Sequence, residues 1–405
     1  MSKCGIDIIE IERIQNAVLN KNGFLERVFT PKEIEYFRKN GCRYETLAGF
    51  FAVKEALSKY LGTGIRGIKF SDIETEHDEY GAPFVCCMGR RAEVSVSISH
   101  NRTTAVAVVC GDDCEEICVR NEEMTKLLPK RAEDANKGSC GKVFITAGSR
   151  GMTGAAYLAA RAALRCGSGL VTVGTPESEQ RVLACKLTEA MTVALPCKDG
   201  IISRDAAFEI VKRCKGADAA VIGPGLGRSR DIMTVIEELV KAYDKTLIID
   251  ADGINALSEN IDILSEKKCS VILTPHPGEM SRLTGLAIDE IQADRENIAK
   301  DFAEKSGAVV VLKGKGTVIA APDGRISVNE TGNCGMATGG TGDVLSGVIA
   351  SFAAQGLEPF EAARLGVYIH GRAGDIAKDC IGIHGLLAGD VAEALPKAIK
   401  ELYGD

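Results

Sequence analysis

The chain of 405 residues contains no tryptophan, and aromatic residues make up only 5% of it. No apolar run approaches the ~20 residues that a membrane-spanning helix needs, and the sequence shows no signal peptide. The 15 cysteines are an odd number scattered through apolar runs, which is typical of buried thiols in a reducing compartment. These absences argue against a disulfide scaffold and a membrane-embedded protein, and we expect a cytoplasmic one.

A strong excess of basic residues is also lacking. The net charge is −7, the first 111 residues contain 15 Lys or Arg and 14 Asp or Glu, and the remainder contains 34 and 42. Neither part has the basic excess typical of a nucleic-acid-binding domain, so nucleic acid is not an expected partner. The nearly neutral first part can still present a local basic face to an acidic partner.

The length of the chain exceeds what a single core usually serves, so we expect more than one domain. The polar, acidic stretch at 111–116 is the best candidate for a boundary. We predict a first domain at 1–111, a connector at 112–118 and a second domain at 119–405. Cys110, Cys114 and Cys118 recur at every fourth position and would share one face of a helix. They indicate either free thiols around the connector or, less readily, a metal site.

Local patterns in the first part predict helices and strands. Thr30-Pro31-Lys32-Glu33 is a capping box with proline at the first helical position. A further helix is expected from about residue 46 to 61, before a glycine. Apolar β-type runs at 94–98 and 104–110 flank Ser-His-Asn-Arg at 99–102, which has the composition of a hairpin loop.

The second part alternates strand and helix patterns. The predicted strands are 142–147, 219–222, 246–250, 270–274 and 308–313, and glycine-rich or polar loops follow several of them. This rhythm predicts βαβ units and a largely parallel, buried sheet covered by helices. Because ligands bind at the carboxyl ends of such strands, we expect the site there.

Two carboxylates in the first part attract attention. Asp7 lies in an apolar strand, where a charge needs a partner, and Glu55 shares one face of an apolar helix with Lys59. The two carboxylates can hold Mg²⁺, with Lys59 near a phosphate. Equally, Glu55 and Lys59 can form a simple ion pair and Asp7 can be a surface residue, so spacing alone leaves the choice open.

Four short motifs in order give the first part a family resemblance. They are Gly-Ile-Asp-Ile-Ile-Glu-Ile-Glu-Arg-Ile at 5–14, Phe-Ala-Val-Lys-Glu-Ala at 51–56, Leu-Gly-Thr-Gly at 61–64 and Ser-Ile-Ser-His at 97–100. Together they resemble holo-[acyl-carrier-protein] synthase, an α+β phosphopantetheinyl transferase. The resemblance implies that Asp7 and Glu55 ligate Mg²⁺ and act in catalysis. A serine of acyl carrier protein then attacks coenzyme A, and 3′,5′-ADP leaves.

The same resemblance assigns three contacts and an assembly. Arg13 would meet the acidic carrier protein, and Lys59 would meet a phosphate of coenzyme A. His100 would lie near the coenzyme A pocket, although a lone histidine more often makes a structural hydrogen bond. Phe50 stands where many relatives carry arginine, which puts one phosphate contact in doubt. Relatives form trimers with active sites between subunits, so a homo-oligomer is implied.

In the second part, Gly340-Thr341-Gly342-Asp343 precedes an apolar, helix-compatible run. Glycines before a helix allow backbone N–H groups to converge on an anion. Asp343 in the first turn can simply favour the helix dipole. Beside a transferring phosphoryl group the same carboxylate can accept a hydroxyl proton, which we favour. The pattern GxxxxGK[ST] is missing, so the sequence does not predict a P-loop enzyme.

Further motifs connect this segment with one family. They are Gly-Ser at 148–149 with Gly-Ala at 154–155, Gly-Pro-Gly-Leu-Gly at 223–227, Thr-Pro-His-Pro-Gly-Glu at 274–279 and Leu-Lys-Gly-Lys-Gly-Thr at 312–317. From about residue 119 onward the chain resembles ADP-dependent NAD(P)H-hydrate dehydratase, whose α/β fold is ribokinase-like. The resemblance implies that ADP phosphorylates the hydroxyl of hydrated NADH or NADPH, that Asp343 removes its proton, and that phosphate then leaves.

The family motifs also assign binding residues. Ala155, Gly225, His276 and Asp343 would contact the hydrated dinucleotide, although His276 can instead be a buried ring in a rigid turn. Contacts with ADP would come from Lys313, Gly314, Lys315, Gly316, Thr317 and Gly342. Relatives often carry an epimerase domain where this chain has its transferase-like part, so epimerisation would be spontaneous or come from another protein.

Two alternatives stay open. The second part can be a ribokinase-like kinase of a small molecule, such as a hydroxymethylpyrimidine, although the motifs at 223–227 and 274–279 disfavour this. The first part can serve only as an oligomerisation module. The presence of both Asp7 and Glu55 speaks against that interpretation.

Overall fold

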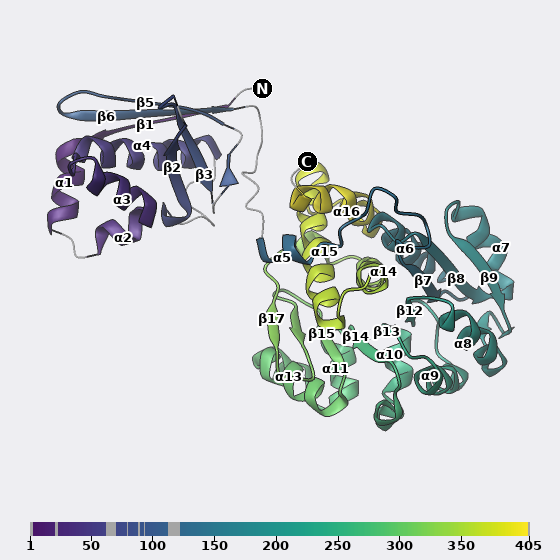
Figure 1. The fold of residues 1–405 in the computed structure, drawn as a ribbon. Coiled ribbons are helices and arrows are strands. Elements are labelled where there is room, and N and C mark those ends of the chain that lie inside the picture. Colours follow the sequence, from purple (N-terminus) through teal and green to yellow (C-terminus); the bar gives the residue numbers. More distant parts are fainter. Residues whose placement is uncertain are drawn as a thin grey trace. The chain divides into compact units, whose positions relative to one another are not determined.

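A computed structural model describes residues 3–20, 23–61, 70–78, 80–87, 90–92, 94–111 and 122–403. The chain divides into two compact units, Met1–Asn121 and Glu122–Asp405, which we call the N-terminal unit and the C-terminal unit (Figure 1). The predicted connector at 112–118 lies outside the described residues, as do Cys114, Cys118 and the glycines of the motif at 61–64.

The N-terminal unit is built on a three-stranded antiparallel sheet in the order β1-β6-β5. These strands are β1 (Lys3–Glu10), β5 (Ser95–His100) and β6 (Thr104–Gly111). Helix α4 (Tyr44–Leu61) lies along one face of this sheet, where its apolar residues form the core with β1 and β6 (Figure 1). The remaining elements are α1 (Ile11–Asn20), α2 (Phe24–Val28), α3 (Pro31–Lys39), η1 (Phe70–Asp72), β2 (Ile73–His77), β3 (Pro83–Cys87) and β4 (Arg90–Arg91).

Local predictions in this unit are confirmed with small changes. The capping box at Thr30 is formed, since Thr30 Oγ1 accepts from the backbone N–H of Glu33 and the Glu33 carboxylate accepts from that of Thr30. The long helix begins two residues earlier than expected, at Tyr44. The prediction that a loop begins at residue 99 is wrong, because β5 continues through His100 and pairs with β6.

Besides capping α3, Glu33 forms a buried ion pair with Lys54. Its carboxylate lies 2.7 Å from the ammonium of Lys54, and both side chains are fully buried. It also accepts a hydrogen bond of 2.8 Å from the backbone N–H of Thr75, while Lys54 donates to the carbonyls of Phe70 and Ile73. This pair connects α3, α4 and β2 inside the unit.

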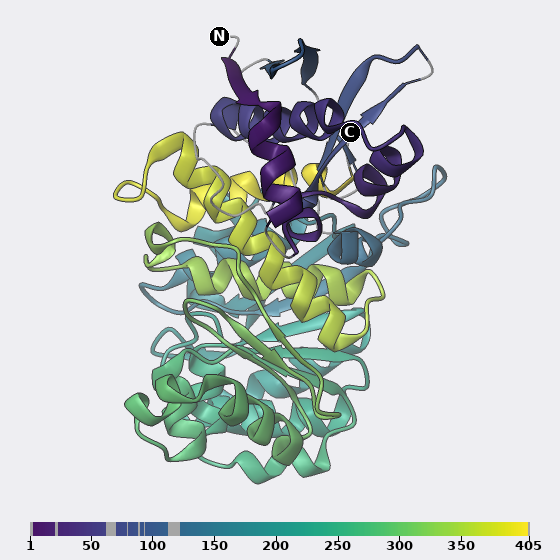
Figure 2. The ribbon, with the colours of Figure 1, turned by 90° about the vertical axis from the view of Figure 1, so that its left-hand side faces the viewer.

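The C-terminal unit contains a nine-stranded sheet in the order β17-β16-β15-β14-β13-β12-β7-β8-β9. The seven strands from β15 to β9 in this order are parallel, and β16 and β17 add an antiparallel edge. Figure 2 shows β16 and β17 crossing the near side of the unit. The strands are β7 (Lys142–Thr146), β8 (Leu170–Pro176), β9 (Met191–Leu195), β12 (Ala219–Ile222), β13 (Thr246–Ile249), β14 (Ser270–Leu273), β15 (Val309–Leu312), β16 (Val318–Ala320) and β17 (Ile326–Val328); β10 (Cys197–Lys198) and β11 (Ile201–Ile202) form a separate ribbon.

Helices cover both faces of the large sheet, as the fold-class prediction required. The first face packs against α5 (Glu122–Leu127), α6 (Thr153–Arg165), α14 (Thr341–Ala354), α15 (Pro359–Ile381) and α16 (Ala388–Tyr403). The second packs against α8 (Ala207–Lys215), α9 (Arg230–Ala242), α10 (Asp252–Leu257), α11 (Pro277–Thr284) and α13 (Arg295–Ser306). The remaining helices are α7 (Glu177–Lys186), α12 (Ile288–Ala293), η2 (Arg204–Ala206), η3 (Ile261–Glu266) and η4 (Cys334–Met336). The chain is thus an α+β unit followed by an α/β unit with a largely parallel sheet, as predicted.

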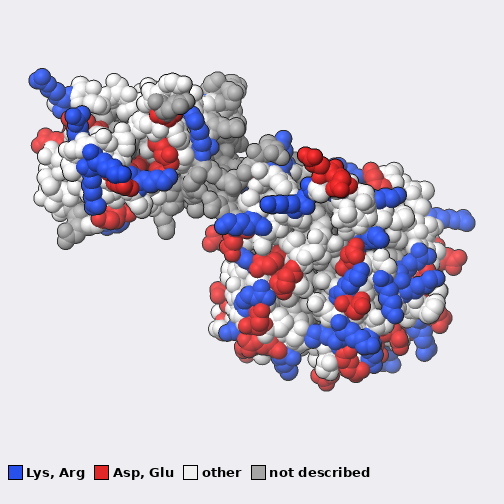
Figure 3. Space-filling view, in the orientation of Figure 1, with Lys and Arg blue, Asp and Glu red and all other residues white. Residues whose placement is uncertain are grey.

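Surface charge and hydropathy agree with the composition. Figure 3 shows basic and acidic side chains interspersed over the visible face of the C-terminal unit. Among the described residues, no helix combines the length and the apolar character that crossing a bilayer requires.

Candidate active sites

In the C-terminal unit, three polar residues follow three neighbouring parallel strands. Asp250 follows β13, Thr274 follows β14 and Lys313 follows β15. Because the carboxyl ends of parallel strands share one edge, the three side chains meet there. Asp250 Oδ1 accepts hydrogen bonds from Lys313 Nζ at 2.8 Å and from Thr274 Oγ1 at 2.6 Å. Asp250 Oδ2 is buried and has no hydrogen-bond partner among the described residues.

Helix α14 begins beside this cluster. Lys313 Nζ lies 3.4 Å from the position that a Cβ on Gly342 would occupy, so its ammonium faces the first turn of the helix. Asp343 stands in that first turn, as predicted. Burial, together with the negative charge of Asp250, raises the pKa of Asp343 to about 7, although Lys313 opposes the shift. A carboxylate with such a pKa can accept a proton near neutral pH.

Lys313 keeps its charge at this position. Burial opposes the charge, but the nearby carboxylates of Asp250 and Glu279 outweigh it and raise the pKa of Lys313. Glu279 lies 3.8 Å from Lys313, and burial raises the pKa of Glu279 to about 6. The single cation of Lys313 therefore lies near three carboxylates, those of Asp250, Glu279 and Asp343.

His276 stands directly before the first residue of α11. It is exposed, so the alternative of a buried ring is wrong, and it is the N-cap of α11. Its Nδ1 accepts from the backbone N–H groups of Gly278 at 3.0 Å and Glu279 at 3.3 Å. Burial of part of the ring and the positive charge of Lys313 lower its pKa. The neutral ring then carries its proton on Nε2, which lies 3.4 Å from Glu279 Oε1.

The loops that follow β7 and β12 lie against each other at the same edge. Ser149 Oγ donates to the carbonyl of Gly225 at 2.8 Å. Gly225 has a φ of 61°, and a Cβ there would lie 2.8 Å from Ala155 Cβ, so the approach of the two loops depends on glycine. Ala155 and Gly225, which the sequence placed in one binding region, are thus direct neighbours.

In the N-terminal unit, β1 crosses α4 very closely. A Cβ on Gly5 would lie 2.0 Å from the carbonyl oxygen of Ala56, so only glycine permits this contact. The crossing brings Asp7 of β1 near Glu55 of α4. Burial and the charge of Asp7 raise the pKa of Glu55, while Lys59 and Arg13 lower it. The structure therefore brings the four predicted residues Asp7, Glu55, Lys59 and Arg13 together.

The ion pair in this cluster differs from the one that the sequence suggested. Lys59 Nζ lies 2.8 Å from Asp7 Oδ1 and also donates to the carbonyl of Ile6 at 3.0 Å. Asp7 is only 15% exposed at its side chain, so it is not a surface residue. Lys59 thus joins helix to strand through Asp7 and leaves Glu55 available to a ligand.

Two carboxylates fit a magnesium site, because Mg²⁺ usually takes one or two of them and completes its shell with waters and phosphate oxygens. Burial and, second to it, the negative charge of Asp7 raise the pKa of Glu55, and a bound cation would relieve the repulsion between the two carboxylates. Among the described residues, no group of three or more His, Cys, Asp or Glu is placed to hold a metal. A magnesium ion held by these two carboxylates would complete its shell with waters or substrate oxygens.

Three further sequence expectations fall outside these clusters. His100 is exposed at the end of β5. Phe50 is buried, and its ring lies 5.8 Å from that of Tyr36, so it is part of the core. Cys110 lies in β6 rather than on a helix, and its Sγ is 2.9 Å from that of Cys4, its cross-strand partner. The helical arrangement assumed for a cysteine metal site is therefore wrong at Cys110.

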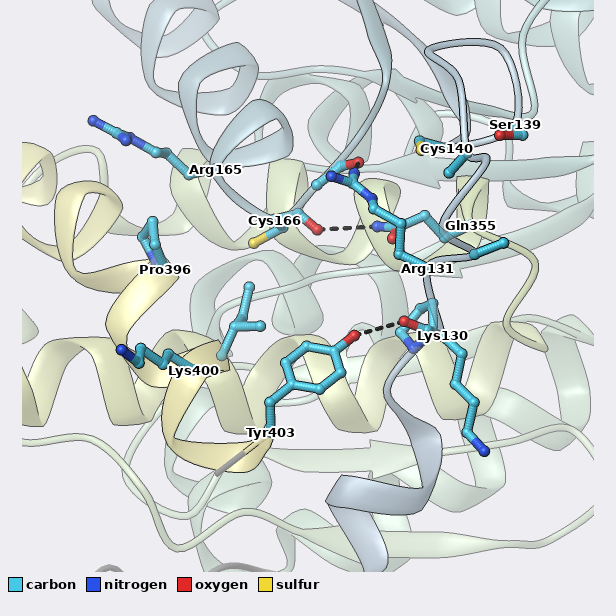
Figure 4. Close-up of a pocket in the computed structure, with 15 residues that line it drawn as sticks. Lys130, Arg131, Ser139, Cys140, Arg165, Cys166, Gln355, Pro396, Lys400 and Tyr403 are labelled. Atoms are coloured by element: carbon cyan, nitrogen blue, oxygen red, sulfur yellow. Dashed lines mark hydrogen bonds between the residues drawn. The ribbon is translucent and has the colours of Figure 1, made fainter. Parts of the chain in front are cut away.

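A separate cavity of about 640 Å³ lies at the opposite, amino-terminal edge of the large sheet. Figure 4 shows Tyr403 at its wall, with the hydroxyl turned toward the segment of Lys130, where it donates to the carbonyl of Pro129 at 2.6 Å. Gln355 Nε2 donates to the carbonyl of Cys166 at its floor. The residues described as lining this cavity include none of the predicted site residues.

Residues 143–397 match the family model of NAD(P)H-hydrate dehydratase. The chain belongs to this family. The bifunctional NAD(P)H-hydrate repair enzyme of Moorella thermoacetica is 46% identical over 276 residues, which cover 68% of this chain and 52% of the relative. The chain thus spans about half the length of that relative. The crystal structure of an ADP/ATP-dependent NAD(P)H-hydrate dehydratase from Bacillus subtilis, co-crystallised with ATP and Mg²⁺, shares 34% identity over 69% of this chain and 96% of that one, with a TM-score of 0.61.

The N-terminal unit has its own match. Residues 3–110 match the model of the 4′-phosphopantetheinyl transferase superfamily. A holo-(acyl-carrier-protein) synthase from Bacillus anthracis, solved with CoA (3′,5′-ADP), is 39% identical over 27% of this chain and 93% of that one, with a TM-score of 0.24. The two family resemblances predicted from sequence motifs are therefore both confirmed.

Sequence reasoning missed two buried acidic residues, Asp250 at the candidate site of the C-terminal unit and Glu33 in the interior of the N-terminal unit. Asp250 was expected only as the end of a strand, and Glu33 only as a capping residue. A signal existed for Asp250, because an acidic residue directly after a buried parallel strand lies at the ligand edge of the sheet. Glu33 offered none, since its partner Lys54 is 21 positions away on another helix.

Proposed function

We propose that the C-terminal unit, whose domain we place at 119–405, dehydrates hydrated NADH and NADPH at the expense of ADP. The observation that carries this proposal is the partly buried Asp343 beside Lys313 at the start of α14, with a pKa of about 7. A base of this kind, next to a cation and the amides of a helix start, suits transfer of a phosphoryl group to a hydroxyl.

In the proposed reaction, Asp343 removes the proton from the hydroxyl on the hydrated nicotinamide ring. The hydroxyl oxygen attacks the β-phosphorus of ADP, and AMP leaves. The backbone N–H groups at 340–342 hold the transferring phosphoryl group. The ring nitrogen then supplies its electron pair, the C–O bond breaks, and inorganic phosphate departs with the oxygen. The resulting iminium ion loses a proton from the adjacent ring carbon, which restores NADH or NADPH.

Binding roles follow from the same arrangement. Lys313, fixed by Asp250, would face the phosphates of ADP beside Gly342, and the loop residues Gly314, Lys315, Gly316 and Thr317 would contact the rest of the nucleotide. Ala155 and Gly225 would line the dinucleotide side, with His276 offering its Nε2–H. The close contact of Ala155 with Gly225 supports a shared surface for one ligand.

Turnover of a hydrate provides the test. NADH hydrate is incubated with the purified chain and ADP, and absorbance at the NADH band and AMP formation are followed together. Equal amounts of NADH and AMP support the proposal. Phosphorylation of a small alcohol such as a hydroxymethylpyrimidine, with no NADH restored, would instead favour the kinase alternative.

We further propose that the N-terminal unit, with its domain at 1–111 and a connector at 112–118, transfers 4′-phosphopantetheine from coenzyme A to a serine of acyl carrier protein. The cluster of Asp7, Glu55, Lys59 and Arg13 supports this. Asp7 and Glu55 would hold Mg²⁺, which neutralises charge on the coenzyme A pyrophosphate when bound. Lys59 would contact a phosphate, Arg13 would attract the acidic carrier protein, and His100 would line the coenzyme A side.

Mass spectrometry of acyl carrier protein after incubation with coenzyme A, Mg²⁺ and the intact chain tests the transferase. A gain equal to one phosphopantetheine is expected, and its absence would leave the N-terminal unit as an oligomerisation module. Glu55→Gln should abolish the gain, whereas the surface change Glu35→Gln should leave it unchanged.

Assembly of three copies is part of the same proposal. On β1, Ile6 is 57% and Ile8 is 68% exposed, on the face of the sheet away from α4. Two large aliphatic side chains in such a row are typical of a surface that another chain covers. Analytical ultracentrifugation should show trimers that dissociate in the variant Ile6→Lys with Ile8→Lys.

A further inference from the structure

A small cleft of about 220 Å³ adjoins the candidate site of the C-terminal unit. It lies between the loop that follows β12, the helix α10 and the helix α11. Gly227 and Asp252, which line it, belong to the edge of the sheet that carries Asp343, and the charge of Asp252 contributes to the raised pKa of Asp343. The cleft is therefore close enough to the reacting centre to take a distant part of the same substrate.

Four charged side chains line this cleft: Arg228, Arg282, Asp252 and Glu259. Asp252 is engaged within the wall, since Oδ2 accepts from the backbone N–H of Gly227 at 2.8 Å and Oδ1 accepts from Asn255 at 3.3 Å. Arg282 is positioned by donating to Asn255 Oδ1 at 2.9 Å. Two arginines and the carboxylate of Glu259 thus remain to meet a ligand.

The mixture of charges restricts what the ligand can be. A site for the pyrophosphate that both dinucleotides carry would be weakened by a carboxylate, because Glu259 would repel it in every case. The two substrates differ at one position, which is a phosphate in one and a hydroxyl in the other. At that position the arginines can bind the phosphate and the carboxylate can bind the hydroxyl. Arginine can accommodate a ribose 2′-phosphate, and a carboxylate can accept the proton of a ribose 2′-hydroxyl.

We infer that this cleft receives the 2′ position of the adenosine ribose of the hydrated dinucleotide. This inference rests on the proposed dehydratase function. Arg228 and Arg282 bind the 2′-phosphate of NADPH hydrate, and Glu259 accepts a hydrogen bond from the 2′-hydroxyl of NADH hydrate. The combination of two arginines with the carboxylate of Glu259 lets the unit use both substrates, where a cleft of one sign would reject one of them.

The test compares the two hydrates in the intact chain with ADP in excess. For the double variant Arg228→Ala with Arg282→Ala, kcat/KM for NADPH hydrate should fall about 10–100-fold, while that for NADH hydrate stays within about twofold. Glu259→Gln should change the ratio in the opposite direction, by several-fold. Arg204→Ala, which removes an exposed arginine outside the cleft, is the matched control and should change neither value.

Equal losses for both hydrates in the double variant would overturn the inference, because they would indicate a contact with a shared part of the substrate. An unchanged ratio in all variants would overturn it as well. Equilibrium titration with NADPH and with NADH, followed by nucleotide fluorescence, decides the inference independently of turnover. If the wild-type chain restores neither dinucleotide, the proposed function fails, yet a preference for NADPH that disappears in the double variant would still support the cleft assignment.

Discussion

Lys54 in the N-terminal unit and Lys313 in the C-terminal unit each lie in the interior against a carboxylate, and the two pairs differ in their surroundings. Lys54 and Glu33 are fully buried, and both find additional backbone partners in the elements that they connect. Lys313 is 18% exposed at its side chain, and Asp250 keeps one buried oxygen without a partner among the described residues. The first pair is satisfied, whereas the second is not.

We interpret the first pair as structural and propose that the second one serves a ligand. Buried polar groups are normally hydrogen-bonded, so an unsatisfied oxygen beside a partly open cation marks a place prepared for a ligand. Burial lowers the pKa of Lys54 and raises that of Glu33, and in each case the charge of the partner opposes the shift. In contrast, Asp250 raises the pKa of Asp343 and Lys313 lowers it.

Removing the base gives the largest expected effect. Asp343→Asn keeps the shape of the side chain but cannot accept the hydroxyl proton, so kcat for hydrate repair should fall about 1,000-fold. The transferase activity of the N-terminal unit should not change. NADH restoration and the mass of acyl carrier protein, measured on the same preparation, check both halves of this expectation.

The same variant should be more stable. The pKa of Asp343 is raised in the folded state from its ordinary 3.8, so its ionisation opposes folding above about pH 4 and most strongly above pH 7. Asp343→Asn should therefore raise Tm of the C-terminal unit at pH 8, and the gain should disappear below pH 4. A lower Tm at pH 8 would show that the ionised carboxylate stabilises the fold, and it would contradict the raised pKa on which its role as a base rests.

Breaking the pair of Glu33 and Lys54 should lower the stability of the N-terminal unit and leave that of the C-terminal unit unchanged. Glu33→Gln deprives the buried Lys54 of its charge partner, which costs about 3–5 kcal/mol. Hydrogen exchange of the amides in α4 should accelerate, while that of α14 stays unchanged. Glu35→Gln removes an exposed pair with Lys39 and should cost less than ~1 kcal/mol. Equal protection in both variants would show that the buried pair contributes no net stability.

Weakening the unsatisfied pair should instead change a pH profile. In the wild type, kcat/KM for the hydrate should rise with pH around 7 as Asp343 ionises. Asp250→Asn removes a negative charge that raises this pKa, so the rising limb should move to lower pH. The KM for ADP should rise about tenfold, because Lys313 loses the charge that fixes it.

A second aspartate provides the control for this experiment. Asp218 pairs with Lys245 at the same 2.8 Å, but it precedes β12 and so lies at the opposite edge of the sheet. Asp218→Asn should leave the pH profile and the KM for ADP unchanged. If the rising limb of the profile moves to higher pH in Asp250→Asn, the pKa of Asp343 has increased. Such an increase would mean that the displacement of Lys313 affects Asp343 more than the loss of the Asp250 charge does.

Much of the fold was accessible from local sequence patterns. The strand at 219–222 and the capping box at Thr30 were predicted residue by residue, because buried parallel strands and helix starts have strong local signals. His100 was misplaced because serine and asparagine near it resemble a loop, while pairing with β6 extends the strand. Tertiary pairing overrode local composition at that point.

Partners across long distances were not accessible. The sequence offered Glu55 as the partner of Lys59 because four positions separate them on one helix, but the structure pairs Lys59 with Asp7. Spacing along a helix is local, whereas the approach of β1 to α4 depends on Gly5 and on the packing of the whole unit. The raised pKa of Asp343 likewise requires burial and neighbouring charges that no single motif contains.

The smallest expected effect concerns His276, where capping and binding can be separated. His276→Ala removes the side chain that accepts two N–H groups at the start of α11 and should cost about 1 kcal/mol. His276→Asn restores an acceptor at the N-cap and should recover that stability, but it cannot place a donor where Nε2–H stands. Thermal unfolding should therefore distinguish the variants, while both should raise KM for the hydrate. If His276→Asn also recovers the wild-type KM, the histidine acts only by holding the helix start.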